Sequence, residues 1–494
     1  MFRRPYLDGL VEYSPDWKKI DENGVMRLAS ELRFNSSVIK LNLGVAGISS
    51  RSFMALADAL TTNGTLTNLN LRCNRCGNDG IIALAQALKV NTTLLKLNLM
   101  GNKITDLAAW QLADALTINH SLVKLHVGWN QIVQGAVGLA QMLTRNSSLR
   151  SLNLSGNPID PWSILAIAEA LKLNSTLVCL SLKGTQIDDG GAEAIGGSLR
   201  CNFALLTLDV GSNLFGSDGA GEILQGLFEN TSVTELGFTH NHIGPVGYHM
   251  IATLLCINST LTKLDLTNTK GADAKGVVRA LMLNSSLTEL NLLNNHLGDE
   301  GAHDIAEVLK KRGVLKRLGL GCNGIGNEGA KQLAEALWIN TSLQVLDLSI
   351  NNIPKPHMFF IGDEEAFTGA RGLIAAFTQS HTLTQLQWRN RPSGRSVKSN
   401  DRIFRNFEKH LKHLNERNLH NQTRRKLTLQ HHCWLAIERY GLSTQWISQY
   451  VINRTFGYFD SKDLKQLLRE ARRMKIADEE AINLNSFYTK CSIF

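Results

Sequence analysis

Two short segments contain residue types that could bind a cofactor or a metal. Gly319 to Gly324 read GLGCNG, which matches the G-x-G-x-x-G pattern of dinucleotide-binding loops, where glycines let backbone N–H groups approach a pyrophosphate. Cys73 and Cys76 form a C-x-x-C pair, a spacing at which two thiolates can bind one zinc ion. A closed zinc site needs four ligands, and the sequence has no second cysteine pair at that spacing.

Two further groups could bind a metal or carry a modification. The first crowds six potential ligands into 24 residues at a spacing that suits no familiar metal site: His410, His413, His420, His431, His432 and Cys433. The second is a set of Asn-x-Ser/Thr patterns, the acceptors of N-glycosylation, such as Asn284-Ser285-Ser286. The sequence has no P-loop, no H-E-x-x-H and no G-x-S-x-G. It therefore predicts no enzymatic activity, no metal site and no cofactor.

The elements that must position these residues come from one unit that repeats along the chain. The pattern L-x-x-L-x-L-x-x-N-x-(I/L) recurs in steps of 26 to 28 residues, with a last step of 40. It begins at Val38, Leu66, Leu94, Leu122, Leu149, Leu177, Leu205, Val233, Leu261, Leu287, Leu315, Leu343 and Leu383. Chance does not produce this period, so the body of the chain is a repeat array.

Each unit predicts a short strand followed by a helix. Alternate leucines, such as Leu287, Leu290 and Leu292, predict a strand with one face buried, and such strands stack as a parallel sheet. In the second half, residues 329–337 place apolar side chains at the spacing of a helix stripe. The recurrent asparagine, as at Asn295, lies where the chain leaves the strand, and its amide can bond backbone groups there. Only the stack buries a core.

This pattern resembles the leucine-rich repeats, and the 28-residue step with a full helix is similar to the ribonuclease-inhibitor-like subfamily. The resemblance covers about residues 21–391. It implies an α/β solenoid, a horseshoe of about 13 repeats with parallel strands inside and helices outside. Residues 21–35 match the helical half alone and are predicted to cap the array.

The charge separates a neutral body from a basic C-terminal region. Residues 392–494 hold 19 Lys and Arg and 10 Asp and Glu, a net of +9, and the other 391 residues hold 33 of each. We predict an N-terminal segment and capping helix (1–37), leucine-rich repeats (38–391) with an insertion at about 354–366, a linker (392–401) and a small basic α-helical domain (402–494).

The repeat also gives the chemical candidates a structural role. Leu318, Leu320 and Asn323 all fall on repeat positions, so nucleotide binding at GLGCNG is not expected. Cys76 takes an inward position as a small buried residue, and Cys73 faces the concave side of the horseshoe.

Ten of the glycosylation patterns share one position, just after a predicted helix. They are at Asn35, Asn63, Asn91, Asn119, Asn146, Asn174, Asn230, Asn258, Asn284 and Asn340. Asparagine can replace glycine in the left-handed conformation that often ends a helix. We therefore predict that these residues are helix end caps in that conformation, without sugar.

The candidate partner-binding residues lie on the predicted concave sheet, where repetition offers a long rigid surface. Most outward positions are small or polar, but Arg72, Met100, His126 and Trp129 cluster in three successive units. Tryptophan and arginine are frequent binding hot spots. Two interpretations of Trp129 stay open: a ring that stands free for a partner, or a ring folded over its glycine neighbours. A second, weaker group is His240, Asn268 and Asn294.

The insertion and the basic region give two further candidates. Met358, Phe359 and Phe360 in the insertion are predicted either to contact the partner or to cover the end of the core. The basic clusters include Arg424-Arg425-Lys426. They suit an acidic partner surface or a phosphate backbone, and equally a solvated helix face.

The sequence favours a non-enzymatic scaffold or adaptor that binds a protein partner on its concave face. The alternative is a regulator of a small GTPase, similar to the Ran GTPase-activating proteins, although their acidic tail is replaced here by a basic one. The chain has no run of about 20 apolar residues and no signal peptide, so we expect a cytoplasmic protein without a membrane span. No nucleic-acid partner is expected.

Overall fold

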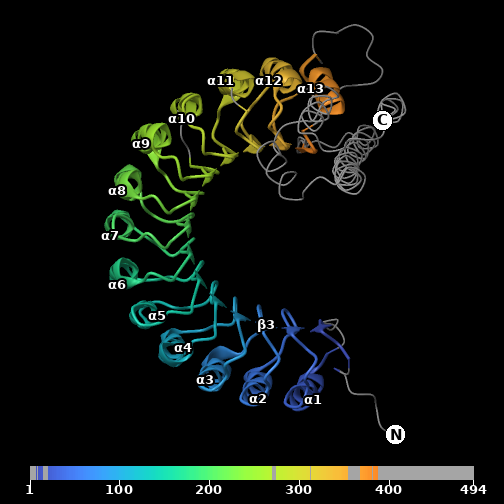
Figure 1. Ribbon diagram of the computed structural model, residues 1–494, viewed down its shortest axis with the longest axis vertical. Helices are drawn as coiled ribbons and strands as arrows, with labels where there is room; N and C mark the ends of the chain where they lie inside the picture. The colour runs from blue at the N-terminus through green and yellow to red at the C-terminus, as the bar shows by residue number, and fades with distance from the viewer. Residues whose placement is uncertain are drawn as a thin grey trace, which may run out of the picture. The chain divides into compact units, whose positions relative to one another are not determined.

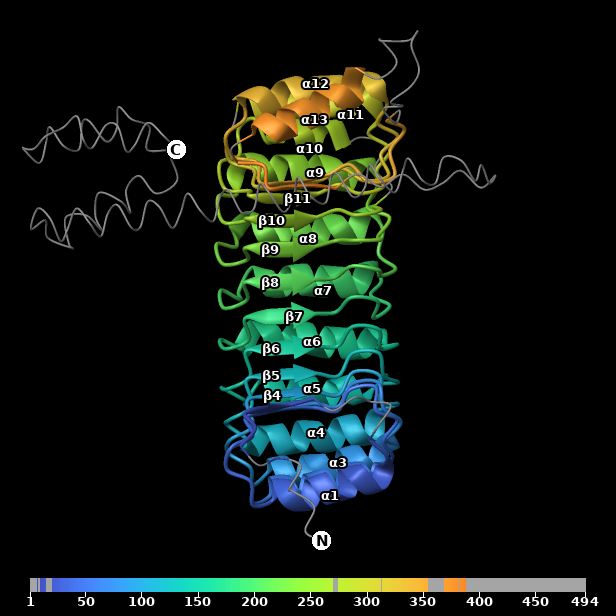
Figure 2. The same ribbon diagram turned by 90° about the vertical axis from the view of Figure 1, so that its right-hand side faces the viewer.

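The computed structural model describes residues 7, 9–14, 20–269, 274–311, 313–353, 368–380 and 382–387. Within them, strands and helices alternate, and every strand joins one parallel sheet in chain order. Helices lie on the outer side of an arc and strands on its inner side (Figure 1), with the strands stacked one above another (Figure 2). The expected α/β solenoid is confirmed. The predicted C-terminal helical domain lies outside the described residues.

The strands are short because each repeat contributes only the two or three residues around its second leucine. They are β1 (Glu12–Tyr13), β2 (Lys40–Asn42), β3 (Asn68–Asn70), β4 (Lys96–Asn98), β5 (Lys124–His126), β6 (Ser151–Asn153), β7 (Cys179–Ser181), β8 (Thr207–Asp209), β9 (Glu235–Gly237), β10 (Lys263–Asp265), β11 (Glu289–Asn291), β12 (Arg317–Gly319), β13 (Val345–Asp347) and β14 (Gln385–Gln387).

The helices cover the outer side of this sheet, one per repeat. They are α1 (Glu22–Leu32), α2 (Ser50–Leu60), α3 (Gly77–Leu88), α4 (Asp106–Ile118), α5 (Gly135–Leu143), α6 (Pro161–Leu173), α7 (Asp189–Leu199), α8 (Ser217–Glu229), α9 (Gly244–Ile257), α10 (Ala274–Ala280), α11 (Gly298–Lys311), α12 (Asn327–Ile339) and α13 (Thr368–Gln379).

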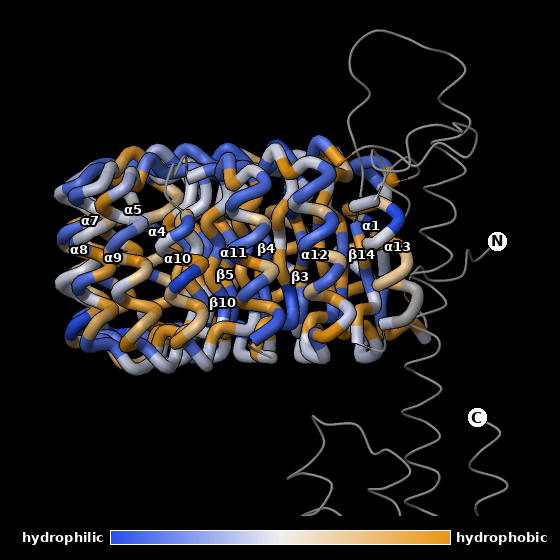
Figure 3. The backbone as a smooth tube through the Cα atoms, turned by 90° about the horizontal axis from the view of Figure 1, so that it is seen from above, coloured by the Kyte–Doolittle hydropathy of each residue, from blue (hydrophilic) through white to orange (hydrophobic). Residues whose placement is uncertain are grey.

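We number the motif positions from one to eleven, so that Leu94 is position one of its repeat. Leu97 and Leu99, at positions four and six, are 2% exposed or less, and so are Leu112 and Leu116 of α4. These side chains fill the layer between sheet and helices. Each helix therefore carries both apolar and hydrophilic residues along its length (Figure 3).

The ladder of hydrogen bonds between repeats continues past the strands to position eight. The backbone N–H of position eight donates to the carbonyl of position seven in the next repeat, as Trp129 does to Ser155 (2.6 Å). Position eight has a positive φ in every repeat up to that of β13, an arrangement that the sequence reasoning missed. Its occupants are Val45, Cys73, Gly101, Trp129, Gly156, Gly184, Ser212, His240, Asn268, Asn294, Cys322 and Ile350.

The asparagine at position nine closes the turn after most strands, as the sequence predicted. The Nδ2 of Asn130 donates to the carbonyls of Val127 (2.8 Å) and of Leu99 in the preceding repeat (3.2 Å). Its Oδ1 accepts from the N–H groups of Asn102 (2.8 Å) and Ile104 (3.1 Å). One buried side chain thus satisfies backbone groups of two repeats.

The asparagines after the helices cap them by a different mechanism from the predicted one. Asn119 has φ −74° and ψ 120°, an extended conformation, so the predicted left-handed cap is wrong. Its Nδ2 instead donates to the carbonyls of Leu88 and Asn91, both at 2.8 Å, and its Oδ1 accepts from the N–H of Leu122 (2.8 Å). The amide nitrogen that a glycan would need is buried and bonded to the preceding repeat.

The N-terminal end adds a strand that the sequence reasoning did not predict. β1 pairs in parallel with β2, with Glu12 opposite Lys40. The predicted capping helix is α1, which begins after Asp21, whose Oδ1 accepts from the N–H of Gly24 (2.7 Å). The insertion at 354–366 lies outside the described residues.

Candidate functional site

The inner face of the sheet presents the side chains at positions three, five, seven and eight of each repeat, which we call the concave face. In β4, for example, Leu97 is buried, whereas Lys96 is exposed and Asn98 half-buried on either side of it. The strands are stacked in parallel and in register, so equivalent positions form columns across the arc. A partner that enters the arc meets these columns.

The four predicted contact residues lie on the concave face of three adjacent repeats. Arg72 is exposed, and Met100 and His126 are half-buried. Trp129 is 67% exposed. His126 is the last residue of β5, and the other three follow β3, β4 and β5 at positions seven and eight.

Trp129 combines both of the predicted interpretations. Its φ is +56°, a conformation that bulky residues rarely adopt. A Cβ placed on Gly156 would lie 2.7 Å from the Cδ2 atom of Trp129, so the indole rests on this glycine. One side of the ring therefore packs on the next repeat, and two thirds of the side chain stays open to solvent.

The other side chains of this group do not all converge on Trp129. The Arg72 side chain leans the opposite way, toward the preceding repeat. Its Cγ lies 2.9 Å from the position that a Cβ on Gly44 would take. Burial and the charge of Lys124 lower the pKa of His126 below its ordinary 6.5, which favours the neutral imidazole. The group thus spreads along the concave face, with the Trp129 ring leaning toward the repeat of β6 and the Arg72 side chain toward that of β2.

The structure joins the second predicted group by hydrogen bonds. The Nδ2 of Asn268 lies 2.7 Å from the Nδ1 of His240, and the Nδ2 of Asn294 donates to the Oδ1 of Asn268 at 2.7 Å. All three occupy position eight and have a positive φ. They form a polar chain along the C-terminal part of the concave face.

The sequence reasoning missed an acidic groove beside this chain. A groove of about 460 Å³ runs across the concave face from β7 to β13. The charged side chains that line it are Lys183, Asp209, Glu235, Lys263, Asp265, Glu289, Arg317 and Asp347. A comparison of the residues at positions three and five across successive repeats would have shown these acidic residues in the sequence.

Two of the groove's cations are already paired. Lys263 lies 2.8 Å from Glu235, and this hydrogen bond raises the pKa of the lysine. Arg317 lies 3.3 Å from Glu289. No ion pair is formed by Asp209, Asp265 or Asp347 with another described residue. The groove therefore keeps an excess of negative charge.

The remaining chemical candidates have structural roles. The N–H groups of Gly326 and Gly329, at the start of α12, donate to Asp299 Oδ1 at 2.7 and 3.0 Å, so a carboxylate holds the place where a nucleotide phosphate would bind after GLGCNG. Cys76 is 1% exposed, and burial raises its pKa to about 12. Cys73 is exposed on the concave face. The described residues contain no group of three side chains able to hold a metal ion.

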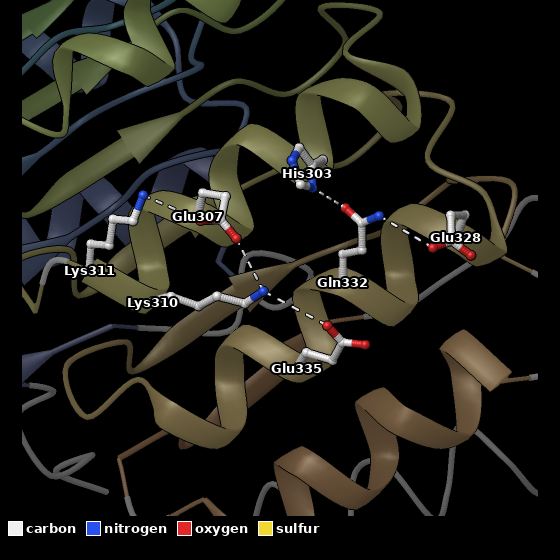
Figure 4. A network of polar contacts seen from close by, with 7 residues as sticks. All are labelled: His303, Glu307, Lys310, Lys311, Glu328, Gln332 and Glu335. Atoms are coloured by element: carbon white, nitrogen blue, oxygen red, sulfur yellow. Dashed lines mark hydrogen bonds and ion pairs between the residues drawn. The ribbon is translucent and has the colours of Figure 1, made fainter.

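The outer face of α11 and α12 carries a network of polar contacts (Figure 4). Lys310 lies 3.2 Å from Glu307 and 3.8 Å from Glu335, and its hydrogen bond lowers the pKa of Glu307. The Nδ1 of His303 lies 2.6 Å from the Oε1 of Gln332. Solvent screens these exposed pairs, so they link neighbouring helices weakly and form no site.

Several predicted features fall outside the described residues: Met358, Phe359 and Phe360, the histidine cluster and the basic clusters. In the part of the chain that the structure describes, no helix has the length and apolar character needed to cross a bilayer.

Comparison with protein families identifies the repeats. The TMOD/LMOD leucine-rich domain matches residues 16–131, and the leucine-rich repeat model matches residues 145–168, 173–196, 229–252, 283–306 and 314–334. The chain is a leucine-rich-repeat protein. Its likeness to the ribonuclease-inhibitor-like subfamily stays a prediction.

Three solved structures are similar to this chain. An internalin from Listeria monocytogenes is 19% identical, with 74% of this chain and 83% of that chain covered and a TM-score of 0.41. Rad7 in complex with Elc1 from yeast is 18% identical, with 71% and 78% covered and a TM-score of 0.44. Actin-binding site 2 of leiomodin-1 is 17% identical, with 37% and 88% covered and a TM-score of 0.26. No curated protein matches the sequence.

Proposed function

We propose that this protein is a non-enzymatic scaffold or adaptor of the cytoplasm that binds a protein partner on its concave face. The stacked strands, at roughly 4.8 Å per strand, give an inner arc on the order of 60 Å. That length accommodates one globular partner. Continuous hydrogen bonding between repeats supports a rigid platform, which reduces the entropy lost on binding.

The exposed ring of Trp129 carries this proposal. A tryptophan with positive φ costs about 1–2 kcal/mol relative to an ordinary backbone conformation. The fold does not require that cost, because Gly101, Gly156 and Gly184 occupy the same position in other repeats. Tryptophan at this position therefore supports a use outside folding, and a large exposed aromatic surface is the chemistry of a binding hot spot.

The neighbouring side chains extend the proposed contact. Met100 and His126 are half-buried beside Trp129 on the concave face, and Arg72 adds a cation at the edge. We propose Met358, Phe359 and Phe360 of the insertion as a second contact with the same partner, on their apolar character in the sequence.

A photo-crosslinking comparison tests the proposal. A photoreactive amino acid at Met100 in the full chain should capture a defined partner from the source cells, and the purified partner then gives a dissociation constant. Trp129→Ala should raise that constant about thirtyfold, since a central hot spot contributes about 2 kcal/mol. The matched control is Trp162→Ala, because Trp162 is 74% exposed on the outer helix α6. Equal affinities for native and Trp129→Ala chains would contradict the proposal.

The alternative, regulation of a Ran-type small GTPase, has its own test. Single-turnover GTP hydrolysis by a panel of small GTPases should change little on addition of the full chain. Acceleration by several orders of magnitude, as a GTPase-activating protein gives, would put the alternative first.

A further inference from the structure

Position five of the repeat shows which charges of the concave face the fold itself requires. In most N-terminal repeats an asparagine oxygen accepts from the N–H of position seven, as Asn98 does from Met100 (3.1 Å) and Asn153 does from Ser155 (2.9 Å). In three of the C-terminal repeats a carboxylate accepts the same bond, as Asp209 does from the N–H of Gly211 (3.0 Å). Asp265 and Asp347 do so too, at 3.0 and 2.8 Å. An amide suffices for this turn, so the three negative charges are surplus to it.

These charges divide the concave face into two halves of opposite sign. At the four concave positions of the repeats from β2 to β7, the charged residues are Lys40, Arg72, Lys96, Lys124 and Lys183. In the repeats from β8 to β13, they are Asp209, Glu235, Lys263, Asp265, Glu289, Arg317 and Asp347. The N-terminal half of the concave face therefore has a net charge of +5, from five cations. The C-terminal half has a net charge of −3, from five carboxylates and two cations.

In the acidic half, polar side chains pack over glycines of the next repeat. A Cβ on Gly237 would lie 2.9 Å from the Oδ1 of Asp209, and one on Gly319 would lie 2.3 Å from the Oδ1 of Asn291. Glycine at these points makes room for the side chains of Asp209 and Asn291, which line the 460 Å³ groove. The carboxylates are half-buried there, where charge interactions are screened less than on an open surface.

Thr239 is a second, independent sign of a ligand at this groove. It lines the groove, is only 7% exposed, and its Oγ1 has no hydrogen-bond partner among the described residues. A Cβ on Gly211 would lie 2.2 Å from this Oγ1, so the hydroxyl lies over the open face of that glycine. Buried polar atoms normally have partners. A cationic side chain with several donors could supply one once the Thr239 hydroxyl turns from Gly211 toward the groove.

We propose that the acidic groove binds an arginine- and lysine-rich segment of the protein partner and so sets the direction in which the partner lies in the arc. This inference rests on the proposed function. The carboxylates extend from β8 to β13, roughly 24 Å at about 4.8 Å per strand, which an extended segment of about eight residues spans. Arginine matches them best, because its planar guanidinium bonds carboxylates in pairs.

Fluorescence polarisation with the full chain tests the proposal. The probe is a labelled twelve-residue peptide with arginine at every third position and glycine or serine between, and the control peptide has glutamate in place of arginine. The native chain should bind only the arginine peptide, and the affinity should fall between 50 and 200 mM salt. The triple variant Asp209→Asn/Asp265→Asn/Asp347→Asn keeps the turns and should bind at least about tenfold more weakly.

Two controls separate the possible failures. Asp79→Asn/Glu193→Gln/Asp218→Asn removes the same charge from exposed positions on α3, α7 and α8 and should bind the peptide like the native chain. Trp129→Ala should also leave the affinity for the peptide unchanged. Partner binding measured in this variant therefore tests the proposed function, and peptide binding tests the groove proposal. No peptide binding by the native chain, or equal binding by the triple variant, would overturn the groove proposal.

Discussion

The two halves of the concave face differ in charge, while the turns beneath them are the same. Position nine is a buried asparagine in most repeats of both halves, such as Asn102 and Asn130 in one and Asn323 and Asn351 in the other. Position five is mostly asparagine in one half, as at Asn98, and a carboxylate in three repeats of the other. The difference shows which positions are set by folding. Positions four, six, nine and eleven hold the stack together, and positions three, five, seven and eight are free to serve a partner.

The largest contrast is expected between Cys76 at position eleven and Cys73 at position eight. Cys76 is 1% exposed, and burial raises its pKa from an ordinary 9.0 to about 12, so at pH 8 it has almost no reactive thiolate. Cys73 is exposed. N-ethylmaleimide followed by peptide mass spectrometry should label Cys73 at least about a hundredfold faster. Comparable rates would place position eleven outside the core.

A second contrast compares the two asparagine positions within one half. Asn130→Ala should cost about 3 kcal/mol, because it leaves buried N–H and carbonyl groups of two repeats unpaired. Asn70, at position five, is half-buried and bonds Asn42 and the N–H of Arg72, so Asn70→Ala should cost about 1 kcal/mol or less. Urea denaturation of the two variants measures the difference. Similar midpoints would mean that position five is as structural as position nine.

The smallest effect expected is the titration of His126, the imidazole at position five. Burial first, and Lys124 second, hold its pKa below 6.5. A lowered pKa in the folded state means that the neutral form is stabilised, a contribution present above pH 6.5 and lost as the pH falls through the folded pKa. NMR titration should therefore find a midpoint below 6.5, and Lys124→Gln should move it slightly upward. A midpoint above 6.5 would indicate an acidic neighbour.

The repeat period predicted the strands, the helices and the curved sheet, because leucine spacing is a local property of the sequence. The positive φ at position eight could not be predicted in this way, since it depends on an N–H bond to the next repeat, as from Trp129 to Ser155. The end caps were placed correctly but explained wrongly, because Asn119 acts through its side chain and not through a left-handed backbone.

The candidate site was predicted only in part for the same reason. The aromatic residue Trp129 stands out in a single repeat, so its type alone drew attention to it. The acidic groove joins Asp209, Asp265 and Asp347 across six strands, and no one repeat shows it. The lean of Arg72 toward Gly44 depends on which neighbour lacks a Cβ, which becomes visible only when repeats are placed side by side.

Parallel measurement of stability and partner affinity for Trp129→Gly tests the central claim most directly. Glycine relieves the positive φ of +56°, as Gly156 and Gly184 do in their repeats, so the melting temperature should stay equal or rise. The dissociation constant for the crosslinked partner should rise about thirtyfold, because the apolar contact is lost. A sharp fall in melting temperature with unchanged affinity would instead show that the ring packs the array and that the partner binds elsewhere.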